Sequence, residues 1–302
     1  MGRFCLVLAI LGVVAGAAAA QVRGEYSPGS TLNGAGTLPD PGFSYSNQFW
    51  YNTADRLHGP NGKATPDRDN FFALTDNNTV VWVPKFQLLH AKMEFMVDVA
   101  VSKGRFDTKN PLNGDMVAVG ATGISNTNFV PFDLGWSLGR IDLQAGLSVY
   151  APTGRYKPHA ADNLSSGFWT LGPQAGATIY LNKSKSNQAS LYTYYAFNTP
   201  ESGTRLIPGQ NDSLDYSLLH TFALREKWTL LAGPAGYGQW QTTDNQRPLT
   251  KGLRYSVDGV GFTLNLSTPY KGLYIGTSQL WEYDARNTYE GRTSIVTGGL
   301  NF

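Results

Sequence analysis

The sequence predicts an all-β protein, a transmembrane antiparallel β-barrel of about 12 strands of the bacterial outer-membrane type. Three observations predict it. Segments along the chain alternate apolar and polar residues with a period of two. The connections between them alternate between long and short. The last segment ends on the aromatic Phe302. A barrel must pair its last strand with its first, because an open sheet edge in lipid leaves backbone N–H and C=O groups without partners.

Residues 1–20 have the features of a secretory signal peptide. Arg3 supplies the charged start, residues 6–14 form an apolar run, and residues 17–20 are alanines at a cleavage site. The apolar run is too short to span a bilayer. The single cysteine, Cys5, would be removed with the signal, so we expect no disulfide and no thiol chemistry in the mature chain.

Residues 21–42 are rich in glycine, serine and proline and have no hydrophobic period. We expect a flexible N-terminal lead-in on the periplasmic side, with a segment folded into the barrel mouth as the alternative. The barrel itself would occupy residues 43–302. No later apolar run reaches the length of a transmembrane helix. The formal net charge of +2 gives no reason to expect a nucleic-acid partner.

The strands are predicted from alternation. The third is among the clearest, because apolar residues from Met93 to Val101 alternate with Glu94, Met96, Asp98 and Ala100. In the fourth, Val130 is placed on the apolar, outward face. In the tenth, the pattern changes near Asp258 and predicts a bulge. The predicted strands are 43–53, 80–89, 93–101, 130–138, 141–150, 168–181, 188–198, 214–224, 228–241, 253–266, 273–283 and 292–302.

The connections support the barrel more strongly than any single strand does. Every odd-numbered strand is followed by a long connection and every even-numbered strand by a short turn. This parity predicts that both termini lie in the periplasm of a Gram-negative bacterium, with long loops outside. The long connections are 54–79, 102–125, 151–167, 199–213, 242–252 and 284–291, and the short turns are 90–91, 139–140, 182–187, 225–227 and 267–272.

Several short motifs resemble one known family. They are the stretch 38–42, Leu134-Gly135-Trp136, the stretch 145–156, Asn163 with Phe168-Trp169, Tyr195 with residues 197–199, and the stretch 251–254. Together they are similar to the outer-membrane transporter family named after the phenol meta-cleavage degradation pathway. The resemblance covers residues 38–302. It implies a barrel transporter for passive uptake of small hydrophobic or aromatic compounds, and it brings no defined catalytic or binding residues.

Alternation also predicts which side chains line the lumen. The acidic ones outnumber the bases, which should disfavour anions and tolerate neutral or cationic solutes. Tyrosine rings offer an apolar face with a polar edge to a weakly polar aromatic solute. The alternative is that these side chains only fill and hydrate the interior. The predicted lumen residues are Glu94, Asp98, Asp133, Asp142, Asp215, Asp258, Trp50, Tyr150, Tyr192, Tyr194, Tyr237, Lys85 and Arg254.

The alternatives to a transporter are a structural barrel without transport and a lipid-modifying enzyme. A serine hydrolase needs a histidine beside its serine, and none of the four histidines, His58, His90, His159 and His220, lies in such a pattern. We therefore expect no enzyme activity. Residues 67–70 lack the spacing of a calcium loop, so we expect no metal and no cofactor.

The expected partners follow from the predicted location. They are outer-membrane lipid, lipopolysaccharide, a small hydrophobic solute and the barrel assembly machinery, which would bind the C-terminal strand ending in Phe302. Basic residues of the outer loops would pair with lipopolysaccharide phosphates. These residues are Arg56, Lys63, Arg68, Arg105, Lys109, Arg155 and Lys157.

Overall fold

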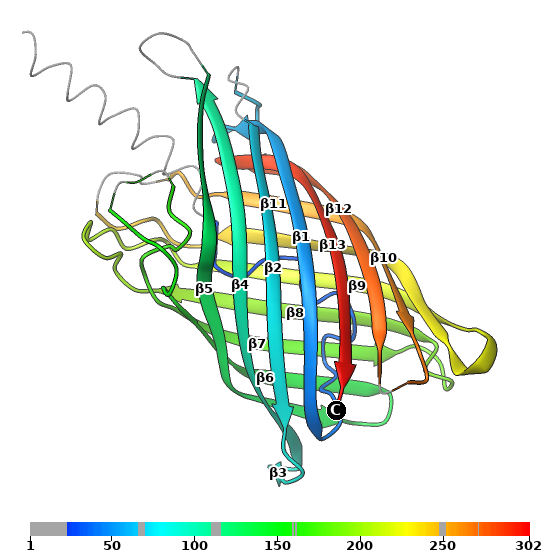
Figure 1. Cartoon of the computed structure of the whole chain (residues 1–302). Helices are drawn as coiled ribbons and strands as arrows, with labels where there is room; N and C mark the ends of the chain where they lie inside the picture. Colours follow the sequence, from blue (N-terminus) through cyan, green and yellow to red (C-terminus); the bar gives the residue numbers. More distant parts are fainter. Residues whose placement is uncertain are drawn as a thin grey trace, which may run out of the picture.

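A computed structural model shows a closed antiparallel β-barrel (Figure 1). The structure describes residues 23–65, 70–109, 116–158, 160, 162–247, 252–270 and 272–302. Its strands are β1 (Gly42–His58), β2 (Asn70–Val83), β3 (Gln87–Leu88), β4 (Ala91–Lys109), β5 (Met116–Ser137), β6 (Ile141–Ala151), β7 (Thr170–Tyr180), β8 (Asn187–Asn198), β9 (Asn211–Ala223), β10 (Thr229–Gln241), β11 (Ser256–Ser267), β12 (Tyr274–Arg286) and β13 (Thr288–Asn301). β3 is a two-residue piece that pairs with β4, and the others form a ring of twelve. The predicted fold is confirmed.

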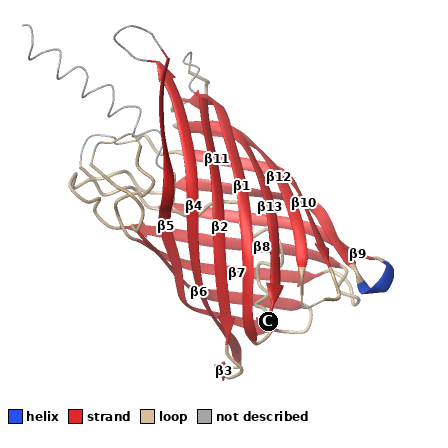
Figure 2. Ribbon diagram, in the orientation of Figure 1, coloured by secondary structure: helices blue, strands red, loops and turns tan. Residues whose placement is uncertain are grey.

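The ring closes between the first and the last strand. β1 pairs with β13 from Ser44↔Asn301 to His58↔Thr288, and β2 pairs with β4 past the short β3. Closure gives the backbone groups of every strand a partner on both sides, which the interior of a lipid bilayer requires. In the part of the chain that is described, helical structure is limited to one 3₁₀ turn at Arg225–Lys227 (Figure 2).

No helix among the described residues has the length and apolar character needed to cross a membrane.

The predicted alternation holds in the third predicted strand, which is the first half of β4. Val97 and Val101 point outward, with Val97 42% exposed, whereas Glu94, Met96 and Asp98 line the interior. The C-terminal strand behaves in the same way, because Val296 is exposed and Ile295 is buried. The outward residues therefore form the apolar surface that faces lipid.

Several long loops of the prediction are shorter than expected, because the strands run on. β1 and β2 together take up much of 54–79, and β4 and β5 extend into 102–125, where they form a hairpin that projects beyond the other strands (Figure 1). Residues 284–291 are almost all strand, with only Asn287 between β12 and β13. The hydrogen-bonded ladder continues through these extensions, for example from Ser102↔Gly123 to Thr108↔Val117 between β4 and β5. Four of the five short turns are confirmed within two residues. The first, predicted at 90–91, is longer, because β2 ends at Val83 before Pro84 and only the two-residue β3 lies between it and Ala91 of β4.

Two orientations predicted from the strand pattern were wrong. A bulge explains the first, and the absence of a predicted bulge from β11 explains the second. The pairing of β5 with β6 shifts between Phe129 and Phe132, around Pro131, which has no N–H to donate. This shift turns Val130 into the lumen, where it is 3% exposed. β11 alternates without a break, so the predicted bulge near Asp258 is absent from that strand.

The bulge near Asp258 lies on the partner strand instead. The β11–β12 register shifts between Ser256 and Asp258, and Asp284 of β12 has a φ of +50°. Asp258 pairs with Tyr283, whose ring is exposed on the outer surface. Asp258 therefore faces outward and does not belong to the lumen.

Glycines on the lumen face make room for tyrosine rings on the next strand. A Cβ built on Gly172 of β7 would overlap the ring of Tyr194 on β8, and one on Gly259 of β11 would lie 2.6 Å from the ring of Tyr237 on β10. Rings that cover a neighbouring glycine fill the space a missing side chain leaves. The tyrosines thus lie flat against the wall.

We predict that Val97→Arg impairs membrane insertion. A charged side chain on the lipid face of a barrel costs about 2–4 kcal/mol near the midplane. The free energy of unfolding from phospholipid vesicles, measured in urea, should fall by that amount. The control is Asp98→Asn on the lumen face, which should insert like the wild type. Equal stability of Val97→Arg and the control would show that the faces are assigned wrongly.

We also predict that Gly172→Ala destabilises the barrel, because the methyl group must displace the Tyr194 ring. Overpacking of this kind costs about 1–3 kcal/mol. Gly298→Ala is the matched control, since its Cβ would meet only the Tyr274 carbonyl oxygen at 3.5 Å. Urea unfolding of both variants should separate them, and equal stabilities would contradict the tight fit of the ring.

Candidate lumen site

Residues 23–41, which we call the lead-in, run through the inside of the barrel (Figure 1). At one end Arg23 bonds Glu282, Thr288 and the carbonyl oxygen of Tyr289, near the β12–β13 turn. At the other end Lys92 Nζ lies 2.8 Å from Asp40 Oδ1, near the short turns. The lead-in thus spans the whole depth of the barrel.

This position differs from the predicted flexible periplasmic lead-in and reaches further than a segment in the barrel mouth. Its first described residue, Arg23, lies at the end that carries the long loops, whereas Phe302 lies at the opposite end. The predicted signal peptide, 1–20, and residues 21–22 lie outside the described part of the chain.

Asp215 of β9 is the main polar anchor of the lead-in. Its carboxylate accepts hydrogen bonds from the Tyr26 hydroxyl at 2.6 Å, the Gly29 N–H at 2.8 Å and the Thr31 N–H at 3.0 Å. The Asp215 side chain is fully buried. A buried carboxylate is tolerated when hydrogen bonds replace its water, so wall and lead-in depend on each other here. Ser217, two residues further along β9, donates to the Leu32 carbonyl oxygen at 2.6 Å.

Apolar contacts hold the same part of the lead-in. Leu32 is buried in a cluster with Trp50, Tyr237 and Leu280. The Tyr26 ring stacks on Tyr192 and Tyr194, with ring centroids 5.5 and 5.1 Å apart. Four side chains predicted for the lumen, Trp50, Tyr192, Tyr194 and Tyr237, therefore pack against the lead-in.

Lower in the barrel, glycine allows the backbone of the lead-in to lie directly on the wall. The Gly36 N–H donates to Thr178 Oγ1 at 3.0 Å, and a Cβ on Gly36 would overlap the Asp142 carbonyl group. Asp142 also accepts a hydrogen bond from the Thr37 hydroxyl at 3.0 Å. The lead-in therefore packs against the wall at several levels.

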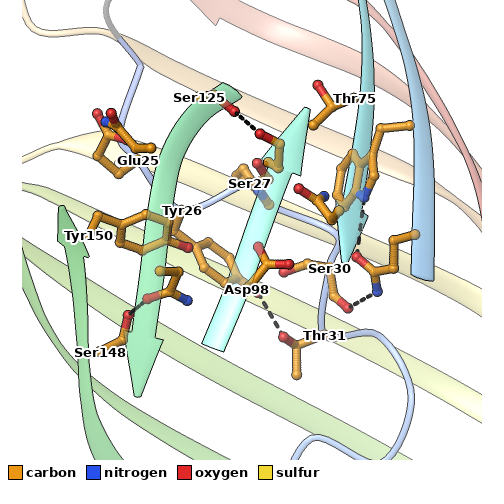
Figure 3. Close-up of a pocket in the computed structure, with 18 of the residues that line it drawn as sticks. Glu25, Tyr26, Ser27, Ser30, Thr31, Thr75, Asp98, Ser125, Ser148 and Tyr150 are labelled. Carbon is orange, nitrogen blue, oxygen red and sulfur yellow. Dashed lines mark hydrogen bonds between the residues drawn. The ribbon is translucent and has the colours of Figure 1, made fainter. Parts of the chain in front are cut away.

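A cavity of about 770 Å³ remains on the other side of the lead-in. It lies between the lead-in and the wall formed by β1, β2, β4 and β5, within the ~300–1,000 Å³ range of small-molecule sites. Figure 3 shows Tyr26, Asp98 and Tyr150 around it. The predicted lumen residues on its lining are Trp50, Glu94, Asp98, Asp133, Tyr150, Tyr192 and Tyr237.

Two predicted lumen bases lie elsewhere. Arg254 precedes β11 and is half exposed, with its Nε 2.8 Å from Asp244 Oδ1 in a loop. Lys85 lies exposed in the turn between β2 and β3. Alternation fails for both residues because neither lies in a regular strand. A base that does enter the barrel is Arg23, which no strand pattern could identify because the lead-in has no period.

None of the described histidines forms a hydrogen bond with a serine side chain. His58 Nδ1 lies 3.0 Å from the Gly62 carbonyl oxygen, and His220 Nδ1 lies 2.6 Å from Asn187 Oδ1. His159 and residues 67–69 lie outside the described residues. Within the described ranges there is no group of three or more acidic, histidine or cysteine side chains that could hold a metal ion.

We predict that Asp215→Ala loosens the lead-in. Each lost hydrogen bond to this carboxylate is worth about 1.5–3 kcal/mol. Planar-bilayer recordings should show larger or more frequent openings than in the wild type, and limited proteolysis of the folded protein should cut the lead-in sooner. Asp98→Asn is the control, because Asp98 bonds Thr79 of the wall. If Asp215→Ala keeps the conductance and the protease resistance of the wild type, Asp215 does not anchor the lead-in.

Comparison with known proteins supports the outer-membrane barrel fold. The structure is similar to the COG4313 outer membrane channel from Pseudomonas putida, with a TM-score of 0.71 and 15% identity, covering 92% of this chain and 100% of that one. It is also similar to the β domain of the Bordetella autotransporter BrkA, with a TM-score of 0.56 and 9% identity over 87% of this chain and 100% of the other. No curated sequence matches.

The fold and these likenesses agree with the predicted location in the bacterial outer membrane. A family model matches residues 54–296, which is most of the barrel, and it agrees with the resemblance found in the sequence motifs. The chain belongs to the family described as putative MetA-pathway of phenol degradation.

Proposed function

We propose that the protein is an outer-membrane channel for the passive uptake of small hydrophobic or aromatic molecules. The observation that carries the proposal is the cavity of about 770 Å³ beside the lead-in, which combines tyrosine rings with polar groups. The likeness to a solved outer membrane channel supports a channel role, and the family description refers to phenol degradation. The aromatic solute class is our own extension of that role.

The cavity lining suits a weakly polar solute. Tyr150 and Tyr192 contribute aromatic rings to the lining. Asn128 and Ser148, which are joined by a 2.7 Å hydrogen bond, contribute polar groups that a solute can hydrogen-bond in turn. A solute moves by replacing one set of weak contacts with another, and a channel needs sites weak enough to leave. The process requires neither ATP nor a cofactor.

The lead-in determines how wide the path is. It fills the side of the lumen next to β8–β12 and leaves the side next to β2, β4 and β5 open. In the proposed mechanism a small solute passes along this open side. Larger solutes require the lead-in to shift away from Asp215.

A structural barrel without transport is the second candidate, and the packed lead-in favours it, since a filled lumen conducts little. Conductance in planar bilayers separates the two functions. An enzyme function finds no support among the described histidines, because their polar partners are Gly62, Glu290 and Asn187.

Two partners belong to the same proposal. Phe302 is highly exposed at the end of β13, where the assembly machinery would bind it. For lipopolysaccharide the exposed Lys63 is the better candidate, together with Arg56, whose nitrogens lie 3.9 Å from the carboxylates of Asp55 and Glu290. Arg105 and Arg155 are engaged with Asp107 and Asp162 at 2.7 and 2.8 Å, which leaves them less free to pair with phosphate.

We predict that proteoliposomes containing the protein admit benzyl alcohol faster than empty vesicles. The double variant Tyr192→Ala, Tyr194→Ala should admit it faster still, because removal of both rings widens the cavity beside Tyr26. The control is Leu191→Ala, whose side chain faces lipid. Solute entry is followed by vesicle swelling.

Two outcomes would contradict the proposal. The first is an equal rate of entry with and without the protein. The second is preferred entry of the anion phenylacetate over benzyl alcohol, since the acidic lining should repel an anion.

A further inference from the structure

The cavity wall carries carboxylates without a neighbouring cation. Glu25, Glu94, Asp98 and Asp133 all line it. Two bases also reach the lining, but neither neutralises these acids. Arg23 is ion-paired with Glu282, and the exposed Arg292 donates to Thr53 at 3.2 Å. A buried charge is normally paired with an opposite charge, so this wall lacks its counter-charge.

The hydrogen-bond partners of these carboxylates are neutral side chains. Glu94 has neither a hydrogen bond nor an ion pair with another described residue. A neutral donor satisfies one oxygen and supplies no counter-charge. The bonds are Asn126 Nδ2 to Glu25 at 2.8 Å, Thr79 Oγ1 to Asp98 at 2.9 Å and Gln174 Nε2 to Asp133 at 2.8 Å.

Glu94 of β4 and Asp133 of β5 lie opposite each other on adjacent strands. They are direct partners in the β4–β5 register, so their Cβ atoms are about 5 Å apart. Gly146 on the next strand leaves the space that the Asp133 carboxylate fills. The Asp133 side chain is 1% exposed, and its Oδ1 atom has no hydrogen-bond partner.

Two uncharged side chains on the same lining also have a buried oxygen without a partner. These atoms are Asn126 Oδ1 and Gln239 Oε1, and both residues are at least nine-tenths buried. Like Asp133 Oδ1, they accept hydrogen bonds and cannot donate them. Unpaired buried acceptors are costly, so an occupant that donates hydrogen bonds suits this cavity.

Aromatic rings lie beside the carboxylate pair. The Tyr192 hydroxyl donates to Gln174 Oε1 at 2.8 Å, and the same Gln174 donates to Asp133. Tyr150 lines the cavity from β6. Ring faces attract cations as well as other rings, so an acidic and an aromatic surface meet at one place.

We propose that Glu94 and Asp133 form a binding site for a protonated aromatic amine. The ammonium group lies between the two carboxylates and the aryl ring packs on Tyr150 and Tyr192. A metal ion suits the site less well. Two carboxylates face each other here, and the described residues contain no group of three side chains that could ligate a metal ion. This proposal names a substrate class for the proposed channel and rests on that function.

Binding to the full-length, detergent-folded protein tests the site directly. Isothermal titration calorimetry compares benzylammonium, benzyl alcohol and phenylacetate. Benzylammonium should bind tightest and phenylacetate weakest. Glu94→Gln and Asp133→Asn should each weaken benzylammonium binding about tenfold or more, because a desolvated charge partner is lost. Neither substitution should change the binding of benzyl alcohol.

Asp142→Asn is the control, since it removes a lumen carboxylate outside the cavity lining. It should leave benzylammonium binding unchanged. If the wild type binds benzylammonium no better than benzyl alcohol, or if Glu94→Gln and Asp142→Asn weaken it equally, the proposal is overturned. The wild-type comparison stands even where a variant fails to fold. Benzyl alcohol flux into proteoliposomes reports on the channel independently of this binding.

Discussion

The fold depends on one constraint, which is that no backbone N–H or C=O group can stay unpaired in lipid. The pairing of β1 with β13, from Ser44 to His58, satisfies the two edges that any open sheet would expose. In a closed barrel, successive side chains along a strand point alternately to the lipid and to the interior. Val97 and Val296 face lipid, whereas Asp98 and Ile295 face the interior. The division between an apolar outside and a mixed inside therefore follows from the same requirement.

Closure of twelve strands also creates a space that wall side chains alone do not fill. Barrels of about eight strands are filled by their own side chains, and larger ones enclose cavities or channels. Here the lead-in fills one side of the lumen. Its contacts with Asp215, Leu280 and the Tyr192–Tyr194 pair lie on that side, and the cavity lies on the other. The asymmetry concentrates uncompensated carboxylates on the open side, where a solute would pass.

Much of this could be predicted from the sequence, because the lipid acts on every strand in the same way. Alternation assigned Asp98, Asp133, Asp215 and Tyr192 to the interior. The prediction from alternation failed where the register of the strands changes. Pro131 shifts the register and turns Val130 inward, and a bulge on β12 accompanies the outward position of Asp258.

The lead-in could not be placed from the sequence for a different reason. Its position depends on single hydrogen bonds to residues almost 200 positions away, such as Tyr26 to Asp215. Gly29 and Gly36 allow close approach to the wall, yet in the sequence they are indistinguishable from linker glycines. Arg23 was missed for the same reason, and with it the ion pair to Glu282.

The central claim is that the lead-in threads the barrel and packs on the wall formed by β8 and β9. Photo-crosslinking in intact outer membranes tests it most directly, with p-benzoylphenylalanine in place of Tyr26, whose ring lies between Tyr192 and Tyr194. Mass spectrometry should find an intramolecular crosslink to the peptide that contains β8. Crosslinks to periplasmic proteins, with none to the barrel wall, would contradict the account.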